Sequence, residues 1–180
     1  MTPSRALPLL SALALAGCGI EARMEARSVC VTQDAEAFPG TTAGGTLISQ
    51  VSYDLGQDLP LVSEPGVDYA LQVQHVAVAL DSSSHLTDLG GITSLTISAL
   101  PPGGSGLPEA ELASYARGED LHPTSIQAAG GEGVELRPYI AGGQLRFQIV
   151  GNGTLPTQAW TAAVTACFGM KVTLDVTDGM

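Results

Sequence analysis

The feature that most constrains this fold is an alternation of apolar and polar residues with a period of two. Between Thr93 and Ala99, for example, Leu95 and Ile97 alternate with serine and threonine. A period of two places every second side chain on one face of a β-strand, whereas an α-helix repeats every 3.6 residues. The alternation recurs along most of the chain and predicts strands at residues 46–55, 67–80, 93–99, 144–149, 160–168 and 170–176.

The longest of the internal stretches, residues 67–80, changes face partway along. Its apolar residues are odd-numbered up to Val73 and even-numbered from Val76 onward. One extra residue in a strand produces this change of parity, because it turns every following side chain to the opposite face. We therefore predict a β-bulge near Gln74 and His75, or a strand that crosses between two sheets.

Two stretches carry signals of short helices rather than strands. Residues 107–115 have Pro108 near the first turn, acidic residues early and Gly118 after the last turn. Residues 134–140 could form one further turn, which Pro138 would shorten or distort. With 22 glycines and 11 prolines, the chain is too often interrupted for a helical bundle.

These patterns predict a mainly β protein. Half-buried strands joined by turns are typical of an antiparallel β-sandwich, Ig-like or related, here with one or two short helices. A small β-barrel is the alternative, since the same alternation fits a sheet that closes on itself. We place this domain at residues 46–180, and no repeat of 20–50 residues is apparent.

The N-terminus has the architecture of an export signal. Arg5 precedes an apolar run from Ala6 to Ala16, and eleven helical residues are too short for a hydrocarbon core of about 30 Å. The run ends in Leu15-Ala16-Gly17-Cys18, which resembles the lipobox of bacterial lipoproteins. This resemblance covers about a tenth of the chain. It implies that Cys18 receives a diacylglycerol thioether and becomes the first residue after cleavage.

The same segment is also compatible with a second processing route. Ala14-Leu15-Ala16 fits the A-x-A pattern of ordinary signal cleavage, which would release a secreted or periplasmic protein that begins at Gly17. The lipoprotein interpretation assigns residues 1–17 to the signal peptide and 18–45 to a lipidated N-terminus and linker. Within that linker, we expect residues 19–28 to form a frayed helix or a tether, because the like-charged i,i+4 pairs are unfavourable in a helix.

The resemblance also implies a location, and charge limits the partners. Gly19 follows Cys18, whereas an aspartate there is linked to inner-membrane retention in enterobacterial lipoproteins, so we expect the outer membrane. Asp and Glu number 18 against 7 Lys and Arg, a formal net charge of -11. Such a chain repels phosphate backbones, which excludes nucleic acid as a partner. Contact with the membrane is left to the lipid anchor.

Two cysteines remain once Cys18 is acylated. An oxidising envelope favours a disulfide between Cys30 and Cys167, and two buried free thiols are the alternative. Trp160 lies on the apolar side of the strand that carries Cys167, and we expect it to be buried.

Few residues suggest chemistry. His75, His85 and His122 are isolated in sequence, and no spacing typical of a metal site occurs, so we predict no metal and no cofactor. The densest polar run extends from Asp81 to Asp88, but it lacks the glycine and glutamate of an EF-type calcium loop. Asx and serine turns explain such a run more simply.

Two functions from different classes follow. The first is a membrane-anchored envelope lipoprotein, not an enzyme, whose domain binds a protein partner or helps assemble the envelope. The alternative is a hydrolase or Ca²⁺-dependent enzyme in which residues of the polar run act together: Asp81, Ser83, His85 and Asp88. The alternative requires that these carboxylates and His85 converge with His122 or another acid.

Overall fold

The computed structural model describes residues 20–41, 45–63, 68–131 and 133–176. This part of the chain forms eight strands, β1 (Ile20–Phe38), β2 (Leu47–Asp54), β3 (Asp68–Leu80), β4 (Ile92–Ala99), β5 (Ala110–Ala116), β6 (Ser125–Gly130), β7 (Gln144–Gly153) and β8 (Trp160–Val176). A single α-helical turn, α1 (Leu55–Asp58), follows β2, and 3₁₀ turns occupy Pro60–Ser63 and Arg137–Tyr139. None of the helices among these residues has the length and apolarity needed to cross a membrane.

The strands pair as a long hairpin rolled upon itself. The first strand pairs with the last, β2 with β7, β3 with β6, and β4 with β5, all antiparallel. Further pairing of β3 with β8 and of β4 with β7 gives the order β1-β8-β3-β6-β5-β4-β7-β2. This connectivity is that of the jelly roll, an eight-stranded arrangement of two Greek keys.

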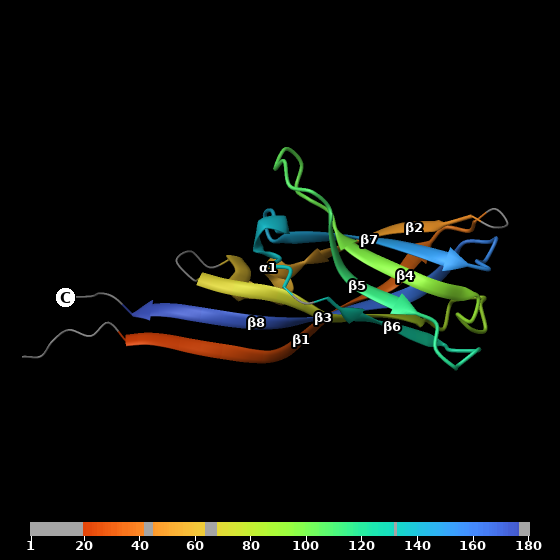
Figure 1. The fold of residues 1–180 in the computed structure, drawn as a ribbon, viewed down its shortest axis with the longest axis horizontal. Helices are drawn as coiled ribbons and strands as arrows, with labels where there is room; N and C mark the ends of the chain where they lie inside the picture. The colour runs from red at the N-terminus through yellow and green to blue at the C-terminus, as the bar shows by residue number, and fades with distance from the viewer. Residues whose placement is uncertain (1–19, 42–44, 64–67, 132, 177–180) are drawn as a thin grey trace, which may run out of the picture.

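The result is two layers that almost close into a barrel (Figure 1). One layer is β1-β8-β3-β6 and the other is β5-β4-β7-β2. The layers are joined along β5 and β6, where the ladder has only two residue pairs, Ala113 with Gly130 and Ser114 with Ala129. At the other edge β1 lies close to β2 without a ladder in the described residues. The predicted mainly β, antiparallel fold is confirmed. The strand order differs from that of an immunoglobulin domain, whose first two strands share a sheet, because β1 and β2 here lie in different layers.

The core lies between the layers and follows the predicted alternation. In β2, Leu47, Val51 and Tyr53 are buried, and in β7 the buried residues are Leu145, Phe147 and Ile149. The hydroxyl of Tyr53 donates a hydrogen bond to the Val164 carbonyl (3.1 Å). The aromatic rings at the centre pack against one another, with ring centroids 5.2 Å apart for Tyr53 and Phe147 and 6.4 Å apart for Phe147 and Phe168.

Two detailed predictions about strands are confirmed. The register of β3 against β8 shifts between Val73 and His75, which is the expected bulge. Trp160 is 2% exposed, and its ring stacks on Phe38 with centroids 4.3 Å apart.

The helix predicted at residues 107–115 is wrong, because this segment contains β5. Leu112 and Ala113 are buried while Glu111 and Ser114 are exposed, and the strand fills the gap between β4 and β6. Pairing on both edges outweighs a local helical preference that amounts to a few tenths of a kcal/mol per residue, about 0–0.7 kcal/mol. The predicted turn at 134–140 is reduced to the 3₁₀ turn Arg137–Tyr139, as its proline suggested.

The frayed helix or tether expected at residues 19–28 is also wrong for the described residues, since β1 begins at Ile20. Its pairing with β8 extends from Ile20, opposite Val176, to Phe38, opposite Trp160. The linker prediction missed this strand because its partner lies some 140 residues further along the chain. Cys18 and the predicted signal peptide lie outside the described residues.

The Cys30–Cys167 disulfide is confirmed, and the alternative of two free thiols is wrong. The two cysteines face each other directly in the β1–β8 ladder, with Cα atoms 4.0 Å apart. The bond therefore fastens the first strand of the jelly roll to the last.

Candidate functional site

One end of the jelly roll gathers four connections. Because consecutive strands run in opposite directions, β1–β2, β3–β4, β5–β6 and β7–β8 are all joined at the same end. We call it the loop end; its connections are residues 39–46, 81–91, 117–124 and 154–159. It is opposite the end at which β1 begins and β8 finishes (Figure 1).

A pair of glycines holds three of these connections together. A Cβ atom on Gly90 would lie 1.9 Å from the Leu121 carbonyl oxygen, and one on Gly91 would lie 2.1 Å from that of Thr154. The gaps are therefore too narrow for any side chain. The Gly90 carbonyl accepts a hydrogen bond from the Arg117 guanidinium (2.6 Å), and the Thr154 N–H donates to the Gly91 carbonyl (2.8 Å).

Asp88 and His122 form the second link between connections. The Asp88 Oδ2 atom is 3.1 Å from Nδ1 of His122, and Oδ1 accepts the Gly90 N–H at 2.9 Å. The Gly90 N–H and then the His122 hydrogen bond hold the pKa of the Asp88 carboxyl below its usual value. The Asp88 side chain is 27% exposed and that of His122 is 81% exposed. The pair is thus reachable from solvent.

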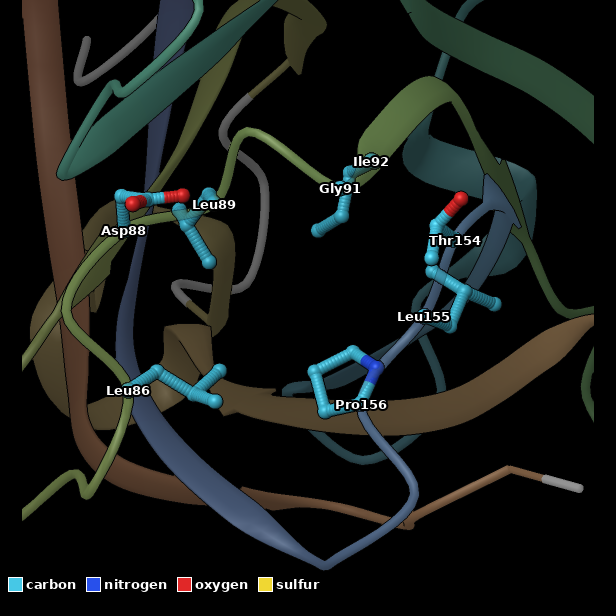
Figure 2. A pocket seen from close by; sticks show the side chains of 8 residues that line it. All are labelled: Leu86, Asp88, Leu89, Gly91, Ile92, Thr154, Leu155 and Pro156. Atoms are coloured by element: carbon cyan, nitrogen blue, oxygen red, sulfur yellow. The ribbon is translucent and has the colours of Figure 1, made fainter. Parts of the chain in front are cut away.

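Beside Asp88 lies a pocket of about 160 Å³, shown in Figure 2. It opens between the β3–β4 and β7–β8 connections, which both pass from one layer to the other. Leu86, Asp88 and Leu89 stand on one side of the opening and Thr154, Leu155 and Pro156 on the other, with Gly91 and Ile92 between them. Leu89, Ile92 and Leu155 are buried, whereas Leu86 and Pro156 are half-buried at the rim. The pocket is therefore an apolar recess with one carboxylate at its edge.

Asp81 anchors a separate cluster. Its Oδ1 atom accepts hydrogen bonds from the Ser83 N–H (2.7 Å), the Ser83 hydroxyl (2.5 Å), the Ser84 N–H (3.1 Å) and the Thr161 hydroxyl (3.2 Å). These donors, the Ser83 hydroxyl first, lower the pKa of the Asp81 carboxyl. The arrangement is the Asx turn that the sequence suggested, and it ties the β3–β4 connection to β8.

The residues of the predicted alternative site are divided between the two clusters. Ser83 bonds to Asp81 and lies 3.0 Å from the Thr161 hydroxyl, whereas Asp88 bonds to His122. In the part of the chain that the structure describes, no hydrogen bond joins one cluster to the other, and His85 makes none. The required convergence is present for Asp88 and His122 and is missing for His85.

The sequence named Asp88 and His122 as possible partners in the alternative site without predicting that they pair, and it did not predict the pocket. The two residues are 34 positions apart, and the pocket combines two connections that are some 65 residues apart. The available signal was the presence of two leucines, Leu86 and Leu89, in an otherwise polar loop. No group of three or more metal-binding side chains occurs among the described residues.

No family model matches this chain, and no curated protein matches its sequence. A jelly roll supports many unrelated functions, so the argument for function depends on the site itself.

Proposed function

We propose that this chain is an envelope lipoprotein, anchored to the outer membrane through Cys18, whose jelly roll binds a protein partner without catalysis. The observation that carries the proposal is the disulfide between Cys30 and Cys167. Disulfides persist in oxidising compartments, and this one follows an N-terminus that resembles a lipoprotein signal. The two observations are independent and agree on export.

The place of Cys18 relative to β1 supports a binding role for the loop end. Only Gly19 separates Cys18 from Ile20, where β1 begins, and the loop end is opposite that point. On this proposal the lipid and the loop end therefore lie at opposite ends of the molecule. The loop end, with its pocket, is the part best placed to meet a partner.

The chemistry of the loop end favours binding over catalysis. The hydroxyls of Ser83 and Thr161 donate to the Asp81 carboxylate, which is a weak base because its pKa is lowered, whereas a nucleophilic serine or threonine requires a base strong enough to take its proton. A protein partner is favoured over a glycan, because seven of the eight aromatic side chains are buried and Tyr115 is half-buried. An exposed aromatic platform for sugar rings would need such side chains on the surface.

Anchoring is tested by metabolic labelling with palmitate. We expect the wild type to incorporate the label and to fractionate with membranes, and Cys18→Ala to do neither. A matched control is Ser28→Ala, which changes an exposed residue of β1 and leaves both the lipid acceptor and the disulfide in place. Equal labelling of wild type and Cys18→Ala would contradict the anchor. A wild type that incorporates no palmitate and is released from the envelope would contradict it as well.

Partner binding is tested by photo-crosslinking in the native envelope. A photoreactive amino acid at Leu121, which is 61% exposed at the loop end, should capture a protein. The matched control is Ser105, which is exposed on the connection between β4 and β5 at the opposite end. Capture at Ser105 but not at Leu121 would contradict the assignment of the loop end.

A further inference from the structure

We infer that the pocket at the loop end receives one aliphatic side chain of a basic protein segment, with Asp88 binding a neighbouring lysine or arginine. The inference rests on the proposed function, because it specifies the partner of a protein-binding domain. It names a site, residues 86–92 with residues 154–156, and the chemistry of the ligand.

The size of the pocket limits what can enter. A cavity of about 150 Å³ lined by leucine, isoleucine and phenylalanine is large enough to hold benzene. The present pocket of about 160 Å³ is similar in size, and leucine and isoleucine supply half of its lining residues. It therefore accepts one side chain of the size of leucine, and it is too small for a folded element or a long acyl chain.

The pocket is formed before any ligand arrives. Gly90 and Gly91 fix the β3–β4 connection against its two neighbours, and Leu89 donates its N–H to the Pro123 carbonyl (2.7 Å). Because the walls are already held in place, little conformational entropy is lost when a side chain enters. This is the property expected of an anchor site for a short segment.

The charge at the loop end selects a basic partner. The four described carboxylates of these connections are Asp81, Asp88, Glu119 and Asp120, and Arg117 is the one guanidinium that opposes them. Asp88 lines the pocket and has about four lone-pair directions, of which Gly90, His122 and, at 3.5 Å, the Thr87 hydroxyl use three. It can therefore bind one further cationic donor next to the aliphatic side chain.

The same charge argues against a second copy of this chain as the occupant. Two molecules with a formal net charge of -11 repel each other, and they would bring acidic loop ends together. A basic segment gains from the same field in both affinity and rate of association.

The test selects ligands from a random nonapeptide library displayed on phage, with the full mature protein in detergent as the target. We expect enriched peptides to place Leu, Ile, Val or Met next to Lys or Arg. Replacing that aliphatic residue by alanine should weaken binding about tenfold or more, because the buried apolar area is lost.

Two pairs of variants locate the contact. Leu86→Lys should abolish binding of the selected peptides, whereas Ile48→Lys makes the same change at an apolar residue that is 54% exposed on β2 and should leave binding within twofold. Asp88→Asn should weaken binding about fivefold or more, whereas Glu111→Gln removes the same charge from an exposed position on β5 with little effect. Circular dichroism confirms that each variant is folded.

Several results would overturn the inference. They are enrichment of acidic or wholly polar peptides, equal losses for the matched variants, failure to enrich any peptide, or a dimer in sedimentation that Leu86→Lys makes monomeric. If palmitate labelling and cross-linking at Leu121 succeed while this test fails, the proposed function stands and the contact lies outside the pocket. If labelling fails while peptides bind, the anchor is wrong and the pocket assignment stands.

Discussion

Asp88 links two connections with a single carboxylate. One of its oxygens bonds to His122 on the β5–β6 connection and the other to the Gly90 N–H on its own connection. Both bonds favour the ionised carboxylate, which explains why its pKa is lowered. A group whose pKa is lowered by folding stabilises the folded state above the pKa of the unfolded chain, about 3.9 for aspartate. The stabilisation is lost as the pH falls through the lower pKa of the folded state.

We therefore predict that Asp88→Asn destabilises the protein at pH 7 and that the difference from wild type narrows as the pH falls below about 4. Urea denaturation at a series of pH values measures both curves. Glu111→Gln, which removes an exposed charge from β5, is the control for the general effect of charge. A difference between Asp88→Asn and wild type that is the same at pH 7 and at the lowest pH would contradict a role for the ionised carboxylate.

Most strands with one buried and one exposed face were predictable from the sequence, but β6 was missed although its residues alternate in the same way. In β4, Leu95 and Ile97 are buried as their spacing indicates, and the parity change in β3 gave the position of its bulge. The pattern failed for β5, whose two consecutive buried residues Leu112 and Ala113 accompany a register shift against β4. It also failed for β1, since charged residues at its start resemble a solvated segment unless the pairing with β8 is known.

The pairing of β1 with β8 is the element-level feature most open to experiment. The Cys30–Cys167 bond closes a loop with a sequence separation of 137 residues. In the chain-entropy model, a loop of this length stabilises the fold by up to about 4–5 kcal/mol. We predict that the double variant Cys30→Ala and Cys167→Ala unfolds at a lower urea concentration than the wild type. Its free energy of unfolding should be lower by up to this amount. Ser28→Ala, a change at an exposed residue next to the bond on β1, should leave the midpoint unchanged. An unchanged midpoint in the double variant would mean that the ladder alone holds β1.

At the scale of the whole molecule, the jelly roll explains why the candidate site escaped prediction. In this fold the first strand pairs with the last, so residues that are remote in sequence become neighbours. Local periodicity carries no information about such pairing. The same topology places the four connections that follow β1, β3, β5 and β7 at one end of the molecule. Asp88 therefore meets His122, and Leu86 faces Pro156, only because β3–β4, β5–β6 and β7–β8 end together. Local periodicity thus predicts most of the strands, whereas it does not predict which residues come together in the site.

With the proposed lipid anchor at Cys18, the arrangement of the two ends predicts how the protein stands on a membrane. The chain has a single tryptophan, Trp160, at the start of β8 near the loop end, whereas β1 begins two residues after Cys18. Ile20 pairs with Val176, and the sixteen steps from there to Trp160 span about 53 Å at about 3.3 Å per residue.

If the molecule stands on the end at which β1 begins, brominated lipids in reconstituted vesicles should not quench Trp160. The emission of Trp160 should also be blue-shifted, because its ring is buried against Phe38. The matched variant carries Trp160→Phe together with Ile20→Trp, and its single tryptophan should be strongly quenched because only Gly19 separates it from Cys18. Equal quenching of the two proteins would show that the domain lies along the bilayer, which would place the loop end against lipid and away from a partner.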